Sequence, residues 1–232
     1  MKMRNVCKFY LLLFSILLVL TLFCSKEKSK VEKVTVGKNK ENIKMESVLL
    51  PDIDSKYDKE LLNLSRKTLR NLTGNTGHIE LSANNPYKQL TYGVFVTLKE
   101  NGELRGCIGQ IFPTTTVENG IEEMTMAAAL NDPRFKPVTS NEINKIKIEI
   151  SILYNMHEIR SIDDFVLKRD GIVIKYKDSI GVLLPQVAEE EAMTKERFFE
   201  IASMKAGLGP EGWKTLPVEL YSFNCKIIKE ED

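Results

Sequence analysis

The chain has 232 residues, of which 33 are lysine or arginine and 32 are aspartate or glutamate, so its formal net charge is +1. This balance creates no overall field that would favour nucleic acid, an acidic membrane surface or an acidic substrate. The length favours a single folded domain with accessory segments, and it is ample for a buried core.

Residues 1–24 have the composition of an export signal. Lys2, Arg4 and Lys8 precede an apolar run over residues 9–23, and this order is typical of a secretory signal peptide. The run is short for a transmembrane span, so an uncleaved anchor that uses its flanking residues is the alternative. We expect the protein to be exported or anchored in the cell envelope, or anchored in the membrane with its domain facing the cytoplasm.

Cys24 ends the apolar run and precedes the polar stretch SKEKSK. The arrangement resembles a bacterial lipoprotein signal, in which this cysteine is lipidated. Phe23 departs from that pattern, because a small residue usually stands there, and an ordinary cysteine beside a signal or anchor is the alternative. Residues 25–50, rich in lysine, glutamate, asparagine and serine, predict a flexible charged tether. The folded domain is expected to span residues 51–232.

The first segment of the folded part predicts an amphipathic helix. Ser55 and Asp58 have the spacing of an N-terminal cap, and Gly74 marks the end of the pattern. The apolar residues that recur near one helical face are Leu61, Leu62, Leu69 and Leu72.

The stretch GVFVTLKENGELRGCIG predicts a β-hairpin, because Asn101 and Gly102 stand between two apolar runs. A two-residue loop fixes the register, and Cys107 then shares a face with Arg105, Val94 and Val96. The expected partners are Glu100 with Glu103, Leu98 with Arg105, Val96 with Cys107, and Phe95 with Ile108.

The rest of the pattern alternates helices with paired strands. Thr115 and Glu118 predict a capping box for a helix that ends near NDPRF, and KIKIEISILY alternates isoleucines with polar residues as a strand does. A strand pair surrounds the turn at residues 177–178, a helix follows Thr194 and ends at Gly207, and VELYSFNCKII is a final strand. Because neighbouring strands pair as hairpins, the predicted fold class is α+β rather than a doubly wound parallel sheet.

The hairpin carries the residues with the clearest chemical potential. Arg105 and Cys107 stand two apart, and a nearby guanidinium favours a thiolate, so Cys107 is a candidate catalytic residue. Gly106 and Gly109 permit a close approach, and with Arg105 they are candidates for binding a carboxylate or phosphate. The alternative is that Cys107 packs in the core as a small apolar residue with a raised pKa.

Asp132 and Arg134 in NDPRF are candidates for the rim of a ligand site. The alternative is a structural role, because Asp132 precedes Pro133 where a helix is expected to end.

Other chemistries have weaker support in the sequence. Neither His78 nor His157 has the spacing of a catalytic partner, and a solvated histidine is the default interpretation of both. Spaced metal ligands, a phosphate-binding loop and a dinucleotide fingerprint are missing from the sequence, so no metal or cofactor is predicted. Cys107 and Cys225 could form a disulfide in an exported domain. Trp213 is interpreted as a core residue.

The segment LRGCIG, preceded by GVFVTL and followed by DPRF, IEISIL, GVLLPQVA, KAGL and Trp213, resembles the AMMECR domain family from Ser55 to Ile228. The resemblance implies a two-subdomain α+β fold with mostly antiparallel strands, flanking helices and a cleft next to the LRGCIG strand. It implies no particular reaction. The motif residues of the family fall on residues 104–109 and 132–135.

The resemblance also implies partners. In many bacteria and archaea, members are encoded or fused with a Memo-like protein and a radical-SAM protein, so a domain facing the cytoplasm could join them. Two features depart from the family pattern. Ser203 stands in the helix where members often carry a cysteine, and the export signal would separate the domain from cytosolic radical-SAM chemistry.

Two functions therefore stay open. The favoured one is a membrane-tethered binding or scaffold module that acts through the cleft around LRGCIG. The alternative is a Cys107-dependent enzyme or substrate-handling domain for a small anionic molecule.

Overall fold

The computed structural model describes residues 53–72, 74, 80–189 and 193–231. The predicted signal, Cys24, the tether and His78 lie outside the described residues. Within the described ranges, no helix is both long and apolar enough to cross a membrane. The elements in chain order are α2 (Ser55–Asn71), η2 (Pro86–Lys88), β1 (Gly93–Glu100), β2 (Glu103–Gln110), α3 (Val117–Leu130), β3 (Ile146–Glu158), η3 (Ile162–Asp164), β4 (Asp170–Tyr176), β5 (Ser179–Leu183), η4 (Pro185–Glu189), α4 (Lys195–Lys205), α5 (Gly212–Thr215) and β6 (Glu219–Lys229).

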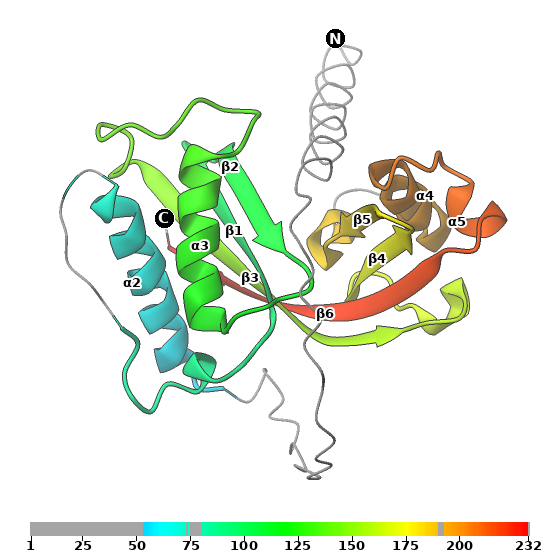
Figure 1. The fold of residues 1–232 in the computed structure, drawn as a ribbon, viewed down its shortest axis with the longest axis horizontal. Helices are drawn as coiled ribbons and strands as arrows, with labels where there is room; N and C mark the ends of the chain where they lie inside the picture. The colour runs from blue at the N-terminus through cyan, green and yellow to red at the C-terminus, as the bar shows by residue number, and fades with distance from the viewer. Residues whose placement is uncertain (1–52, 73, 75–79, 190–192, 232) are drawn as a thin grey trace, which may run out of the picture.

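One antiparallel sheet of six strands runs through the molecule in the order β2-β1-β3-β6-β4-β5. The helices flank it in two groups: α2 and α3 lie beside β1, β2 and β3, and α4, with α5 packed against it, lies beside β4 and β5 (Figure 1). We call these groups with their strands the first and the second half. The predicted α+β class with antiparallel strands and flanking helices is confirmed.

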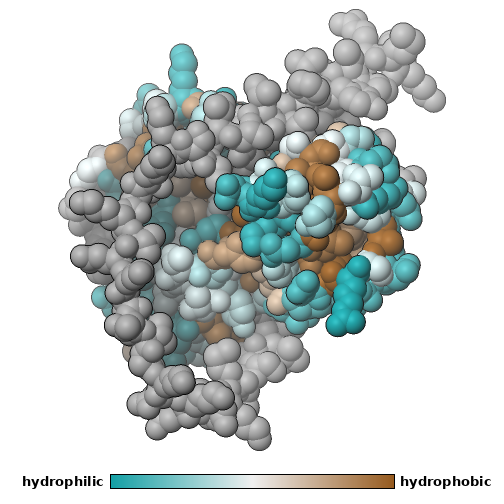
Figure 2. All heavy atoms as spheres, turned by 45° about the vertical axis from the view of Figure 1, so that its right-hand side comes forward, coloured by the Kyte–Doolittle hydropathy of each residue, from teal (hydrophilic) through white to brown (hydrophobic). Residues whose placement is uncertain are grey.

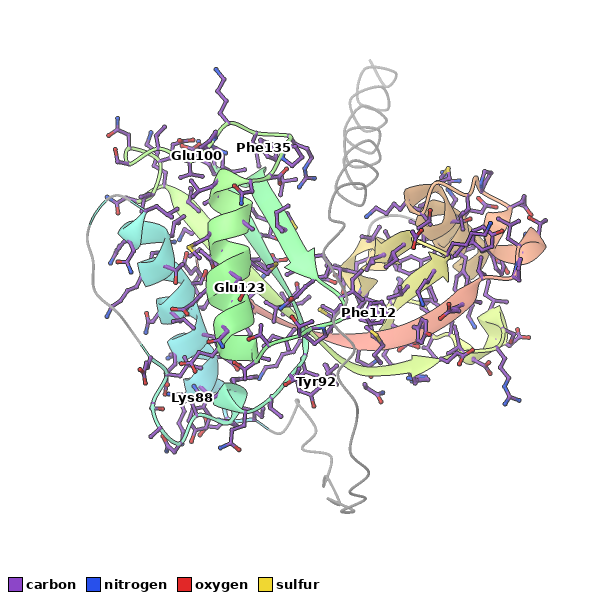
Figure 3. All side chains as sticks on the ribbon, viewed as in Figure 1. Lys88, Tyr92, Glu100, Phe112, Glu123 and Phe135 are labelled. Carbon is purple, nitrogen blue, oxygen red and sulfur yellow. The ribbon has the colours of Figure 1, made fainter. Side chains whose placement is uncertain are left out.

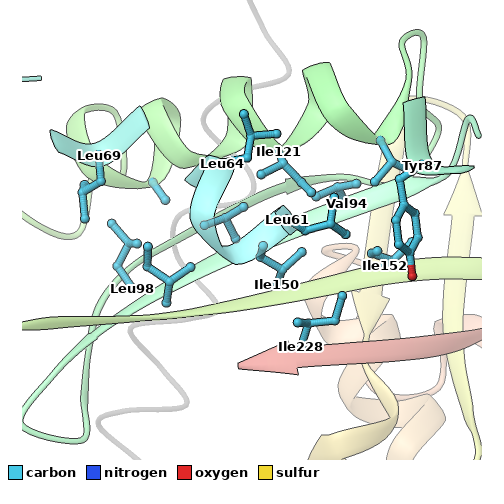
Figure 4. Close-up of a cluster of buried hydrophobic side chains, with 14 of the residues drawn as sticks. Leu61, Leu64, Leu69, Tyr87, Val94, Leu98, Ile121, Ile150, Ile152 and Ile228 are labelled. Atoms are coloured by element: carbon cyan, nitrogen blue, oxygen red, sulfur yellow. The ribbon is translucent and has the colours of Figure 1, made fainter. Parts of the chain in front are cut away.

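Each half has its own apolar core. In the first half, alternate residues of β1 and β3 pack against the leucine face of α2 and against α3 (Figure 4). One face of the sheet and one face of each helix therefore form a single buried layer. In the second half, the ring of Phe165 lies 5.4 Å from that of Phe198 and 5.1 Å from that of Phe199. Partly buried Trp213 adds a ring 5.0 Å from Phe199, in agreement with its predicted core role.

A third apolar cluster lies on the opposite face of the sheet. It contains Leu153, Val173, Val182 and Phe223, with Phe95 packed against them. Because these residues come from β3, β4, β5, β6 and β1, burying them together curls the sheet and turns its edge strands β2 and β5 toward each other (Figure 1).

The surface of the second half is mixed in character. Apolar side chains gather on the half that carries α4 and α5, interspersed with hydrophilic ones (Figure 2). Partly buried apolar residues such as Met204, Leu208 and Val218 border its core. A gathering of this kind does not by itself identify a partner.

Two predicted helix caps are wrong by one residue. Asp54, not Ser55, caps α2, and its side chain accepts a hydrogen bond from the amide of Lys56. Thr116, not Thr115, caps α3. Glu118 does not complete a capping box; it accepts a hydrogen bond from the amide of Leu81, which comes from a segment distant in sequence. That tertiary contact competes with the local one that the sequence suggests.

Candidate functional site

A β-bulge in the first hairpin determines which side chains accompany Cys107. Asn101 and Gly102 form the predicted turn, both with positive φ. Beyond the pair Glu100–Glu103 the predicted register is wrong, because the ladder shifts between Leu98 and Lys99. The observed partners are Lys99 with Leu104, Leu98 with Gly106, Thr97 with Cys107, Val96 with Ile108, and Phe95 with Gly109.

The shift moves Cys107 to the sheet face opposite α3. Val94 and Val96 point into the first core, whereas Cys107 lies beside Thr97, whose Oγ1 is 3.2 Å from the Cys107 Sγ. The predicted common face of Cys107 with Val94 and Val96 is therefore wrong, because one extra residue in a strand exchanges the two faces.

The edge of β2 at Cys107 is bound by side chains of the loop that follows α3. An edge strand has backbone groups without a neighbouring strand. Here the Asp132 Oδ2 accepts the amide hydrogen of Cys107 at 2.8 Å, and the Arg134 Nη2 donates to the Cys107 carbonyl at 3.2 Å. The DPRF motif thus replaces a missing strand at the Cys107 position.

Asp132 and Arg134 also bind each other through two side-chain hydrogen bonds, 2.9 and 2.7 Å long. Only 4% of the Asp132 surface is exposed. Burial alone would raise the pKa of Asp132, but the hydrogen bonds from Arg134 and from the Cys107 amide outweigh it and keep that pKa below its ordinary value. Asp132 is therefore charged at neutral pH, and its charge is matched by Arg134.

The side chain of Arg105 binds residues other than Cys107. Its Nε donates to the Glu142 carboxylate at 2.7 Å and its Nη2 to the Lys136 carbonyl at 2.9 Å. It also lies over the ring of Phe135, which is at the same end of the first half as the β1–β2 turn near Glu100 (Figure 3). Arg105 connects the hairpin to the loop after α3; its predicted role in ligand binding stays a prediction.

Tight packing explains both glycines of LRGCIG. A Cβ on Gly106 would overlap the carbonyl oxygen of Ala128 in α3, and a Cβ on Gly109 would overlap the ring of Phe95. The glycines let α3 and the Phe95 ring approach β2 closely. Their predicted role as ligand-binding residues is not needed to account for them.

The second half contributes a lysine that sequence analysis did not single out. Lys205 ends α4, and its Nζ donates to the Val182 carbonyl of β5 at 3.2 Å. Its ammonium group is close enough to interact electrostatically with the Cys107 thiol and the Arg134 guanidinium. Loss of hydration, with a smaller contribution from Arg134, lowers the pKa of Lys205 to about 8. The KAGL segment was the available sequence signal.

Burial shifts the pKa of the Cys107 thiol upward, whereas it shifts that of Lys205 downward. Burial raises the thiol pKa above the ordinary 9.0, although the hydrogen bond with Thr97 and the charges of Arg134 and Lys205 act in the other direction. Cys107 is therefore a neutral thiol at physiological pH. We use the name Cys107 site for Thr97, Cys107, Asp132, Arg134 and Lys205.

Ser203 occupies the helix position where the resemblance leads one to expect a cysteine. Its hydroxyl donates to the Gly209 carbonyl at 2.6 Å and accepts the Trp213 amide hydrogen at 3.2 Å. Ser203 thus stabilises the turn between α4 and α5.

The remaining candidates stand apart from this site. His157 is exposed, and its Nδ1 is hydrogen-bonded to the Asn155 carbonyl. Cys225 faces Leu153 on the neighbouring strand, and both Cys225 and Cys107 are free thiols, so the possible disulfide is not formed. The described part of the chain contains no group of three or more side chains able to bind a metal.

An open surface pocket lies on the first half, lined by Arg66, Lys147 and Glu230 among others. Arg66 binds Glu230 and the carbonyls of Ile143 and Ile146. Since these contacts join α2 to β3 and to the end of β6, Arg66 and Glu230 have a structural role in this pocket.

Two features define a class of two-part α+β domains to which this chain corresponds. A curled six-stranded sheet carries helices at both ends, and an Asp-Pro-Arg loop binds the edge of an LRGCIG strand. Residues 62–228 match the model of the AMMECR1 family, and the chain belongs to this family.

Archaeal proteins are among the relatives of this chain. A protein of Methanosarcina acetivorans is 39% identical over 145 residues, which are 60% of this chain and 72% of the relative. One of Methanocella arvoryzae is 34% identical over 182 residues, 73% and 90% of the two chains. The crystal structure of an uncharacterized protein from Pyrococcus horikoshii is similar with a TM-score of 0.70 and 29% identity, over 77% of this chain and 94% of that one.

Proposed function

We propose that this AMMECR1-family chain is a binding module that takes a small carboxylate or phosphate group between Arg134 and Lys205. One observation carries the proposal: the charges of Arg134 and Lys205, which come from the two halves, both act on the Cys107 thiol. Of these two cations, only Arg134 has a carboxylate partner among the described residues. The Cys107 site therefore has one positive charge more than its own carboxylate neutralises.

The surroundings of these charges favour an anion. The Thr97 hydroxyl donates its hydrogen to the Cys107 Sγ, and the neutral thiol of Cys107 can donate a hydrogen bond to an oxygen atom. The partial loss of hydration around Lys205 strengthens its attraction to a negative charge, because the local dielectric constant is lower than in water. A bound anion would also favour the charged form of the lysine.

The alternative, an enzyme that uses Cys107 as a nucleophile, has less support. A nucleophilic cysteine needs a thiolate and usually a neighbouring base. Burial raises the Cys107 pKa, and the titratable side chains that act on this thiol are Arg134, Asp132 and Lys205, with no histidine among the described residues at the site. Only Thr97 and the two cations favour the thiolate.

Isothermal titration calorimetry of the full-length chain with inorganic phosphate and with lactate tests the binding proposal. Lys205→Met keeps most of the side-chain stem and removes the charge, and we expect it to weaken binding about tenfold or more. Lys214→Met is the matched control, since Lys214 is exposed and pairs with Glu211. Equal affinity in wild type and Lys205→Met, or no binding of either anion, would refute the proposal.

We further propose that the N-terminal segment attaches the module to a membrane through lipid on Cys24. Metabolic labelling with a fatty-acid analogue tests this: wild type should be labelled and should enter the detergent phase, and Cys24→Ser should do neither. A wild-type chain that carries no label and stays in the aqueous phase would refute attachment through lipid.

For a domain that faces the cytoplasm, a Memo-like or radical-SAM protein is the proposed protein partner. Co-purification of tagged wild-type chain with each candidate tests this partnership. If neither protein binds, the partnership is refuted, and the small anion remains the proposed ligand.

A further inference from the structure

An exposed aromatic pair lies where the two halves meet. Phe112 follows the end of β2, and 44% of its surface is exposed, although large apolar side chains are mostly buried in proteins. Its ring contacts that of Tyr221 of β6 (Figure 3), with 6.0 Å between the ring centres and 80° between the ring planes. An aromatic contact thus holds the Phe112 side chain at the surface, where part of it stays open to a ligand.

The Tyr221 side chain is held at both ends. Its hydroxyl donates to the Glu219 carboxylate at 2.7 Å, and Glu219 also accepts from the ammonium group of Lys175 at 3.0 Å. The body of Tyr221 packs against the third apolar cluster. Because the ring is already fixed, it does not have to be ordered when a ligand binds.

Two carboxylates accompany the rings. Glu219 precedes Tyr221 by two residues, and Glu158 of β3 is the direct partner of Tyr221 across the ladder, so both carboxylates lie on its sheet face. Glu219 is paired with Lys175, whereas exposed Glu158 has no cationic partner in the described part of the chain. The surroundings of the rings therefore carry one negative charge more than Lys175 neutralises.

We propose that Phe112 and Tyr221, together with the charge of Glu158, bind the quaternary ammonium group of a small molecule. The face of an aromatic ring attracts a cation. Two nearly perpendicular rings form a corner, and a cation in this corner can lie within about 6 Å of both ring centres. This site shares no residue with the Cys107 site, so it goes beyond the function proposed there.

A quaternary ammonium group suits this surface better than a primary one. A primary ammonium group has three N–H donors that need acceptors, and Glu219 already accepts from Tyr221 and Lys175. A trimethylammonium group has no N–H donor, so contact with the rings and a nearby negative charge are sufficient. An uncharged group of the same shape gains only the contact, because Glu158 does not attract it.

Choline and dimethylbutanol test the proposal, because dimethylbutanol has the shape of choline with a carbon atom in place of the charged nitrogen. The full-length chain is titrated into each compound, and the methyl proton signal is followed by NMR. We expect choline to bind at least about fivefold more tightly than dimethylbutanol, with its methyl signal moved upfield by the ring faces. Equal affinities, or no binding of choline, would overturn the cation site. Binding to phosphatidylcholine vesicles alone would overturn the small-molecule ligand in favour of a lipid.

Three variants separate the ring face from the charge. Phe112→Leu keeps an apolar side chain and removes the ring, so it should weaken choline binding about fivefold and change dimethylbutanol binding little. Glu158→Gln keeps the size and removes the charge, and it should weaken choline alone. Leu130→Ala is the control, since Leu130 is exposed to a similar extent, 41%, on α3. Equal choline affinity in wild type and Phe112→Leu would overturn the proposal.

Discussion

Asp132 accepts the backbone hydrogen bond of Cys107 at 2.8 Å, although 25 residues separate them in the chain. The same carboxylate binds Arg134, which donates to the carbonyl of Cys107. The DPRF loop and the LRGCIG strand are thus one unit, in which a buried ion pair determines the position of the cysteine backbone. The charge of Arg134 also acts on Lys205 of the second half.

The first prediction concerns this ion pair. Asp132→Asn should lower the free energy of unfolding by about 3 kcal/mol, because it leaves the half-buried Arg134 without its counter-charge. Urea denaturation measures the loss. Asp163→Asn, at an exposed carboxylate, is the control and should change stability by less than about 0.5 kcal/mol. Equal stability of the two variants would contradict the structural role of Asp132.

The two glycines of LRGCIG should respond differently to alanine. Both variants should lose about 1–3 kcal/mol, because the new methyl groups overlap Ala128 or Phe95. Only Gly109→Ala should be rescued by a second change, Phe95→Leu, since its obstacle is a side chain, whereas Gly106→Ala meets a backbone carbonyl. Thermal unfolding of the single and double variants decides this, and rescue of Gly106→Ala by Phe95→Leu would contradict the packing described.

The sequence predicted the elements better than the contacts between them. The alternation of isoleucines and the Asn101–Gly102 turn identified strands correctly, because these signals are local. The bulge beside Leu98 was not predictable, since it depends on how closely α3 approaches Gly106. Its effect on the candidate site is large: it places Thr97 beside Cys107 and turns Arg105 toward Glu142.

The candidate site was also predicted only in part, because some of its residues are brought together by tertiary contacts and not by local sequence patterns. Cys107, Asp132 and Arg134 belong to motifs and were identified as candidates. Lys205 comes from the second half, about 100 residues from Cys107 along the chain, and no spacing rule connects residues across a curled sheet. Only the KAGL motif pointed to its segment.

Cys107 should react slowly in the native protein. Because burial raises its pKa, we expect iodoacetamide to label it more than about tenfold slower at pH 7.5 than in urea-unfolded chain. Peptide mapping separates it from the other cysteines, and Cys225, with a pKa of about 12, should be slow as well. Native labelling of Cys107 as fast as that of the unfolded chain would favour the enzyme alternative.

Acid should weaken the link between Arg105 and Glu142. The hydrogen bond from Arg105 and those from Thr139 lower the pKa of Glu142 to about 2 in the folded protein, from an ordinary value of 4.5. As the pH falls, the unfolded chain takes up this proton first, so the stability from this pair is complete above about pH 4.5 and is lost toward pH 2.

Glu142→Gln should therefore lack this part of the acid dependence, which urea midpoints between pH 5 and pH 2 would measure. Glu211→Gln, at an exposed carboxylate, should keep the wild-type dependence. A Glu142→Gln curve parallel to wild type would contradict the ion pair.

The most direct measurement is the pKa of the Lys205 amine by nitrogen NMR in the full-length chain, with the signal assigned through Lys205→Arg. The account predicts a pKa of about 8 in the free protein and a higher one with saturating phosphate, because a bound anion stabilises the ammonium form. A pKa at the ordinary 10.5 that phosphate does not change would contradict it, since Lys205 would then be a solvated side chain outside any anion site.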